Sequence, residues 1–162
     1  MAGKQHTYSV KVVWTGNTAT GTSSARSYTR DYDITAPGKP TIEGSSDPSF
    51  RGDPARWNPE DLLLASLSAC HKLWFLGLCA QAGINVTAYE DHATGEMEEE
   101  RTGAGQFTSV TLHPRVTLSA TSDAEKALNL HHKAHDMCFI ARSVNFPVMN
   151  EPVIVHEAEH DA

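Results

Sequence analysis

The feature that most constrains this chain is a long apolar stretch between Asn58 and Gly83 with helix signals at both ends. Asn58 is a good N-cap, Pro59 suits the first helical position, and Gly83 suits a C-terminal stop. A helix over 58–83 would carry apolar side chains on nearly every side, so it needs protein around it. The sequence therefore predicts a long central helix buried inside a domain.

The same stretch is long enough to cross a membrane. Against this, His71 and Lys72 lie at its middle, and ionisable groups are costly in a lipid-exposed span. The first residues show no apolar segment behind a positive charge, so we expect no signal peptide. With only three cysteines and no disulfide framework, the sequence favours a cytoplasmic protein without a membrane partner.

Alternating apolar residues predict strands on both sides of the helix, and so an α+β domain. A net charge of −7 without a basic stripe argues against a nucleic-acid partner. The 162 residues suffice for one domain with its own core. Within this domain, we expect N-terminal strands over 6–35, a long functional loop over 36–57, the central helix over 58–83, a strand pair over 84–118, a second helix over 122–138 and an acidic tail over 157–162.

Three details within these segments carry predictions of their own. A polar strand is expected over 18–24, between two more apolar strands. Pro114 has no backbone N–H to donate, so it predicts an edge strand or a bulge. Ser122 and Glu125 fit a capping box at the start of the second helix.

The three cysteines can be sorted by their spacing. Cys70 and Cys79 lie nine positions apart on the predicted helix, on opposite sides and about 13 Å apart along its axis. A disulfide needs Cα atoms within about 7 Å, so these two cannot bond within one chain. Cys79 lies in an apolar run and behaves as a small core residue. Cys70 and Cys138 are therefore the candidate redox pair.

Two stretches around these cysteines resemble the motifs of the OsmC/Ohr family of thiol-dependent hydroperoxide reductases. The resemblance covers most of the chain and implies an OsmC-like α+β fold. In that fold, antiparallel sheets pack around a long buried central helix, and two chains form an intertwined homodimer. The matching residues are the run Asn58-Pro-Glu-Asp-Leu-Leu followed by Ala65, Ser66, Ala69 and Cys70, and the run Lys133-Ala-His-Asp-Met-Cys-Phe-Ile-Ala-Arg-Ser.

The resemblance implies a peroxidase that reduces organic hydroperoxides to alcohols without a cofactor. Cys70 would attack the peroxide as a thiolate and become a sulfenic acid, with which Cys138 would condense to a disulfide. A dithiol would then reduce that disulfide. Cys70 suits the attacking role because an arginine-bearing loop precedes its helix, whereas Cys138 is expected at a helix C-terminus, where the dipole raises a thiol pKa.

An activating arginine and its carboxylate partner are expected near Cys70. Family members commonly carry this arginine in the loop before the central helix, and Arg51 is the nearest match, with Arg56 and Arg30 as alternatives. Glu60 would accept hydrogen bonds from the guanidinium and hold it over the sulfur.

Aromatic side chains near the two motifs would suit a pocket for the alkyl tail of the peroxide. We expect Phe50, Trp57 and Phe139 to bind substrate. Trp74 and Phe75 lie on the predicted central helix, where core packing is the simpler role.

His71 departs from the family pattern, because peroxidase members usually carry an apolar or aromatic residue there. The simplest role for a lone histidine is a hydrogen bond to a backbone carbonyl, and the alternative is an imidazole that perturbs Cys70. A second hypothesis is a metal- or ligand-binding protein without turnover. It rests on His131, His135 and Cys138, which share one helical face and have zinc-ligand chemistry. No second half-site with metal spacing is evident, so we expect no metal. In a third hypothesis, the chain keeps the fold for ligand sensing.

Overall fold

The structure, a computed structural model, describes residues 3–158. Residues 159–162, most of the predicted acidic tail, lie outside the described part. The chain divides into two units, Met1–Leu62 and Leu63–Ala162. The boundary falls inside the first long helix, α1 (Pro59–Gln81), so the two units are described separately.

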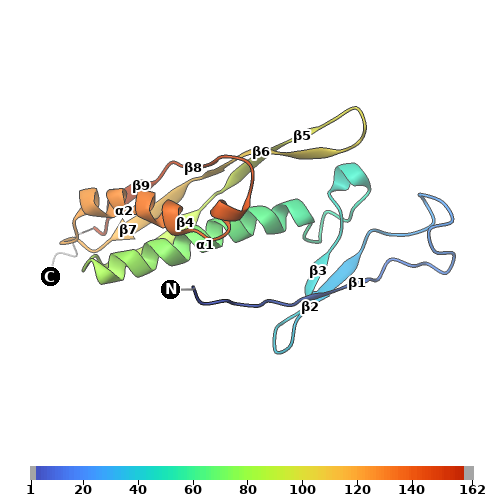
Figure 1. Ribbon diagram of the computed structural model, residues 1–162, viewed down its shortest axis with the longest axis horizontal. Helices are drawn as coiled ribbons and strands as arrows, with labels where there is room; N and C mark the ends of the chain where they lie inside the picture. The colour runs from blue at the N-terminus through green and yellow to red at the C-terminus, as the bar shows by residue number, and fades with distance from the viewer. Residues whose placement is uncertain (1–2, 159–162) are drawn as a thin grey trace. The chain divides into compact units, whose positions relative to one another are not determined.

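The N-terminal unit contains one antiparallel sheet with the strand order β1-β2-β3 (Figure 1). Its strands are β1 (Lys11–Trp14), β2 (Tyr32–Thr35) and β3 (Ile42–Gly44). The polar strand predicted over 18–24 is absent from this unit, and turns occupy these residues. The Asn17 side chain accepts hydrogen bonds from the N–H groups of Ala19 and Gly21. An asparagine that captures nearby backbone donors favours a turn over a strand.

The segment 36–57, expected to be a loop, has structure of its own. It contains β3 and a short 3-10 helix, Pro48–Phe50, capped by the Asp47 side chain. The chain then returns alongside β3, where Trp57 N–H donates to the Glu43 carbonyl and the Ser45 N–H donates to the Trp57 carbonyl. The prediction of a connection without its own structure was therefore wrong. The sequence missed these backbone pairs because they join residues that no local pattern relates.

The predicted start and stop of the central helix are confirmed in α1. The Asn58 side chain accepts a hydrogen bond of 2.8 Å from the N–H of Asp61. At the other end, Gly83 has a left-handed φ of 72°, and the Ile84 N–H donates to the Cys79 carbonyl at 2.9 Å. This is the Schellman arrangement, in which a residue of positive φ lets the chain turn back and satisfy a free helix carbonyl.

Burial of α1 within a single chain is one-sided. Leu67, Phe75 and Cys79 are buried, whereas the Leu73 side chain is 66% exposed. The prediction of a helix covered on all sides therefore does not hold for one chain. By length and composition alone α1 could cross a membrane, but core helices share these properties, and its buried side packs against the sheet and the second helix.

The C-terminal unit contains two three-stranded sheets, with the orders β4-β7-β9 and β5-β6-β8 (Figure 1). Each sheet pairs one antiparallel and one parallel strand, because β8 and β9 run parallel to β6 and β7. The prediction of purely antiparallel sheets was therefore wrong. Helix α2 supplies the crossover that parallel neighbours need. The strands are β4 (Val86–Asp91), β5 (Thr94–Glu99), β6 (Gly105–Leu112), β7 (Pro114–Leu118), β8 (Val148–Asn150) and β9 (Val153–His156).

The predicted strand pair over 84–118 is four strands, and Pro114 explains one of the two breaks. Pro114 is the first residue of β7, which is the central strand of its sheet rather than an edge. Proline cannot donate to a strand ladder and is tolerated as the first residue of a strand. The N–H before it, that of His113, donates to the Asp91 carboxylate at 2.7 Å.

Helix α2 (Ala124–Met137) runs antiparallel to α1 and lies beside it (Figure 1). Asp123, not Ser122, caps its N-terminus, because the Asp123 carboxylate accepts from the Lys126 N–H at 3.0 Å. The Ser122 hydroxyl instead accepts from the Asn85 N–H. The helix ends as predicted at the second cysteine motif, with Cys138 as its C-cap.

Candidate active site

The C-terminal unit brings Cys70 and Cys138 together. Cys70 is half-buried in the middle of α1, and Cys138 is 1% exposed at the end of α2. The two thiols lie close enough together for Cys70 to raise the pKa of Cys138, and both are free. The antiparallel packing of the two helices creates this contact between residues 68 positions apart. A sulfenic acid on either sulfur would thus have a partner thiol within reach.

The Cys138 thiol is a weak acid in this setting. Burial raises the pKa of Cys138 to about 11, and the adjacent Cys70 thiol adds to the rise. The Ala141 N–H donates to the Cys138 sulfur at 3.5 Å and partly opposes this effect. The sequence predicted a raised pKa and attributed it to the helix end, whereas the main cause in the structure is burial. At neutral pH, Cys138 is a thiol, while Cys70 is the more accessible sulfur of the two.

Cys79 takes no part in this contact. It is 1% exposed in the main core cluster with Phe75 and Leu118. Burial raises the pKa of Cys79 to about 11, which keeps it protonated and unreactive at neutral pH. The prediction of a small buried core residue is confirmed.

The three candidate arginines all belong to the N-terminal unit, where their surroundings differ. Arg30 donates to the carbonyls of Ala25 and Tyr28 and lies over the Tyr28 ring. Arg56 faces three carboxylates, with nitrogen–oxygen distances of 4.0, 3.7 and 3.6 Å. Those carboxylates belong to Asp31, Asp33 and Glu43. Both guanidinium groups are thus engaged within their own unit.

Arg51 differs from both. It is exposed at the end of the 3-10 helix with a left-handed φ of 67°. Within residues 3–158 its guanidinium makes no hydrogen bond or ion pair. Of the three candidates, Arg51 is therefore the one whose guanidinium is available to a further group.

Glu60 lies half-buried in the first turn of α1 and neighbours Tyr32 of β2. Burial raises the pKa of Tyr32, and the negative charge of Glu60 raises it further. The Tyr32 hydroxyl donates to the Trp57 carbonyl at 3.5 Å. The sequence did not single out Tyr32, because only the folding of β2 against the end of the loop brings it near Glu60.

The aromatic residues expected to bind substrate are exposed, each within its own unit. Phe50 is 41% and Trp57 is 56% exposed in the N-terminal unit. Phe139 is 66% exposed in the C-terminal unit, where its ring meets the half-buried Trp74 ring edge-on at 5.5 Å. Phe75 is fully buried, which confirms its core role.

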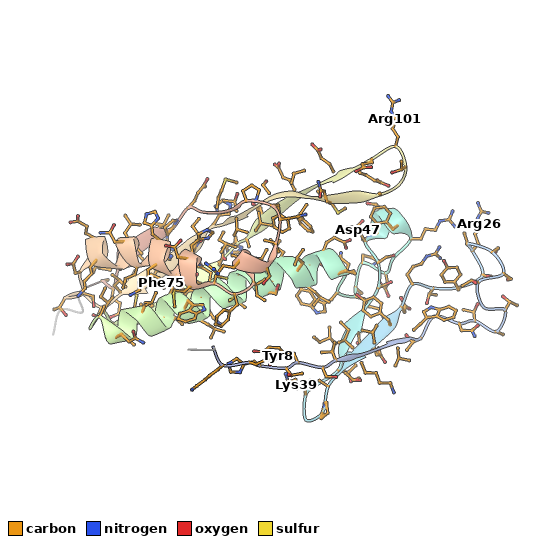
Figure 2. The ribbon with its side chains drawn as sticks, viewed as in Figure 1. Tyr8, Arg26, Lys39, Asp47, Phe75 and Arg101 are labelled. Atoms are coloured by element: carbon orange, nitrogen blue, oxygen red, sulfur yellow. The ribbon has the colours of Figure 1, made fainter. Side chains whose placement is uncertain are left out.

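His71 lies in an environment that the sequence did not predict. Its Nε2 forms a 2.9 Å hydrogen bond with Nδ1 of His131, and both side chains are at most 2% exposed. The expected bond to a backbone carbonyl is thus wrong. Phe75, labelled in Figure 2, stacks on the His131 ring at 3.9 Å. Sequence could flag His71 only as a departure from the family motif, since its partner lies 60 positions away.

Burial keeps both imidazoles neutral. It lowers the pKa of His71 to about 4, against a smaller opposing effect of Asp91. Burial likewise lowers the pKa of His131 to about 3, and the neighbouring rings of His71 and His132 lower it further. No group of three or more metal-ligating side chains is assembled within the described residues. The set of His131, His135 and Cys138 is thus not gathered as a metal centre.

Comparison with known proteins decides the family. Residues 52–151 match the family described as OsmC-like protein. The chain belongs to the OsmC-like family. The family predicted from the two cysteine motifs is thereby confirmed, as is the α+β OsmC-like fold. Members of the wider OsmC/Ohr family include organic hydroperoxide resistance proteins.

Solved structures show the same fold. An OsmC-like protein of unknown function from Vibrio cholerae is 31% identical, with a TM-score of 0.82 over 92% of this chain and 100% of that one. An organic hydroperoxide resistance protein from Elizabethkingia anophelis is 18% identical, with a TM-score of 0.66 over 95% of this chain and 100% of that one. A comparison with curated proteins gives no match.

Proposed function

We propose that this OsmC-like protein is a cysteine peroxidase that reduces organic hydroperoxides to alcohols. The observation that carries the proposal is the contact between Cys70 and Cys138, two free thiols on neighbouring helices of a family that includes hydroperoxide resistance proteins. The more accessible Cys70 takes the attacking role, and the buried Cys138 takes the resolving role.

The reaction divides into three balanced steps. The Cys70 thiolate attacks the distal oxygen of the hydroperoxide R–O–O–H, the O–O bond breaks, and the leaving alkoxide takes a proton to become the alcohol. Cys70 is now a sulfenic acid. The Cys138 thiol then attacks the Cys70 sulfur, and water leaves as the disulfide forms. A dithiol in the surrounding compartment, which we propose is the cytoplasm, reduces this disulfide through a mixed disulfide and becomes oxidised itself.

Arg51 is the proposed activator of Cys70. A guanidinium near the sulfur would favour the thiolate, and the Arg51 guanidinium makes no ionic contact within the described residues that would hold it elsewhere. Glu60 is the proposed acceptor that orients this guanidinium. Phe50, Trp57 and Phe139 are the proposed apolar contacts for the alkyl group of the substrate.

We further propose that the working unit is a homodimer. Large apolar side chains are exposed in one chain, including Tyr8 at 87%, Val10 at 67% and Leu73 at 66%. An exposed apolar face on a central helix is typical of a protein–protein interface. A second copy of this chain packed against α1 would cover Leu73.

The alternative function, a metal- or ligand-binding protein without turnover, rests on the histidines of α2. His131 is hydrogen-bonded to His71, so it is not available as a ligand without breaking that bond, and no group of three or more metal-ligating side chains is gathered within the described residues. The geometry therefore favours thiol chemistry over metal binding.

The proposed function is tested by hydroperoxide consumption in the presence of a dithiol. Cys70→Ser should abolish turnover. Cys79→Ser lies on the same helix and serves as the matched control, because Cys79 is buried in the core away from the redox pair. If Cys79→Ser were as inactive as Cys70→Ser, the assignment of roles would be wrong.

The proposed dimer is tested by light scattering coupled to gel filtration. Leu73→Glu places a charge on the exposed apolar face of α1 and should yield a monomer. Gln81→Glu adds the same charge at the exposed end of α1 and should leave the dimer intact. A Leu73→Glu chain that stays dimeric would show that this face is not the interface.

A further inference from the structure

A buried polar contact joins the two helices that carry the redox cysteines. His71 of α1 and His131 of α2 share a hydrogen bond of 2.9 Å, and their rings are nearly parallel, with an interplanar angle of 8°. Phe75 covers one face of the His131 ring. Within residues 3–158, the second nitrogen of each ring, Nδ1 of His71 and Nε2 of His131, has no hydrogen-bond partner. This contact is therefore polar, directional and enclosed by core side chains.

The pair has a fixed relation to the two thiols. His71 directly follows Cys70 on α1. His131 precedes Cys138 by seven positions on α2, which is about two helical turns and so the same side of the helix. Both partners of the hydrogen bond thus sit on the same helices as the thiols, and any sliding of α2 along α1 would disturb both contacts.

We propose that His71 and His131 are positioning residues that hold Cys138 against Cys70. Their hydrogen bond fixes the axial register of α2 on α1, and that register determines the distance between the two sulfurs. This inference rests on the proposed function only in what it implies for the peroxidase cycle. The thiol contact itself can be measured without any peroxide.

Energetics favour a positioning role over simple space filling. An apolar pair would fill this volume without leaving two buried nitrogens unpaired, and each such nitrogen costs about 1–3 kcal/mol. Apolar side chains, however, tolerate sliding, whereas a hydrogen bond between two rings holds only at one register. Buried polar pairs in helical assemblies fix register at a cost in stability in the same way.

The test is the equilibrium of the Cys70–Cys138 pair with oxidised and reduced glutathione. One oxidised glutathione takes two electrons from the two thiols, which lose their protons and form the disulfide, and two reduced glutathiones result. The equilibrium constant is the effective concentration of one thiol at the other. It is read by acid quenching, alkylation and intact mass, in a Cys79→Ser background that removes the third thiol.

Four chains are compared with the unsubstituted protein in that background. His71→Leu and His131→Leu each leave the remaining imidazole without its partner. The double variant removes both polar groups, and removing both partners of a buried bond is often nearly neutral for stability. Val116→Ala is the matched control, because it opens a cavity in the same core on β7 without touching the hydrogen bond.

We expect both single variants and the double variant to lower the effective concentration at least about tenfold. Val116→Ala should lose stability but keep the original value. If the single variants do not fold, the double variant and Val116→Ala decide the question. A double variant with the original effective concentration would overturn the inference. So would a chain carrying only Cys79→Ser that forms no Cys70–Cys138 disulfide. If the disulfide forms with glutathione but no hydroperoxide is consumed, the positioning role stands and the proposed peroxidase function fails.

Discussion

Acidification should destabilise this protein through its two buried imidazoles. In the folded chain, burial lowers the pKa of His71 to about 4 and that of His131 to about 3, from an ordinary value of 6.5. Between these values and 6.5, the unfolded chain binds protons that the folded chain does not. Since stability falls as pH falls wherever the unfolded state binds more protons, the loss begins near pH 6.5 and continues down to the folded pKa values.

The size of the effect follows from these pKa values. At about pH 5, an unfolded imidazole is almost fully protonated while each folded ring is still mostly neutral. Relative to neutral pH, this difference costs about 2 kcal/mol for each ring, or about 4 kcal/mol for the pair. A typical domain has only about 5–15 kcal/mol of net stability. At about pH 5, the two histidines alone would thus remove a large part of this net stability.

The assay is urea unfolding, followed by circular dichroism at several pH values between about 7.5 and about 5 and at one protein concentration. The matched control is the double variant His71→Leu/His131→Leu. It retains Asp91, His132 and His135, the other ionisable groups that influence the pair. The difference in pH-dependent unfolding free energy between the two chains should therefore report the contribution of His71 and His131. Equal losses of unfolding free energy in both chains over this range would refute the reasoning.

Four further single substitutions have expected outcomes. Cys138→Ser should trap the sulfenic acid after one equivalent of hydroperoxide, detected as a mass gain of one oxygen. Arg51→Ala should slow the first oxidation step in stopped-flow mixing. Arg56→Ala, which loses its carboxylate contacts, should mainly lower the unfolding temperature. The reverse result would exchange the roles of the two arginines. Asn58→Ala should cost about 1 kcal/mol of unfolding free energy, because it removes the cap of α1; an unchanged urea midpoint would count against that cap.

Local signals predicted α1 well. Its start depends on the bond from the Asp61 N–H to the Asn58 side chain, and its end depends on the positive φ of Gly83. Both are properties of a few neighbouring residues, and they can be recognised without knowing the rest of the fold. The contact of Cys70 and Cys138 was also anticipated, because spacing excluded Cys79 and the family motifs marked the other two.

Features that depend on distant pairing were predicted less well. The parallel pairing of β8 with β6 and of β9 with β7 requires knowing that α2 crosses over between them. The short strand β3 forms because residues at the end of the loop return to pair with it. Neither has a periodic signal within its own segment, since three or four residues are too few to show one.

The misjudged role of His71 has the same origin. A histidine in an apolar helix can reach a carbonyl of its own helix or a partner elsewhere, and sequence favours the local choice. In the structure the partner is a second histidine on α2, and the two share one hydrogen bond. The sequence likewise places His131 on one helical face with His135 and Cys138, as zinc ligands would lie, because helical spacing shows which residues share a face but not what that face contacts.

The acidity of Cys138 makes helix register important for the proposed cycle. A thiol with a pKa of about 11 is ionised to only about one part in ten thousand at neutral pH, and the thiolate is the reactive form. Contact with Cys70 can offset this, because reactions between groups held together proceed as if one reactant were present at very high concentration. Disulfide formation should therefore depend more on the α1–α2 contact than the first oxidation step does. A polar bond that fixes that contact would therefore act mainly on disulfide formation.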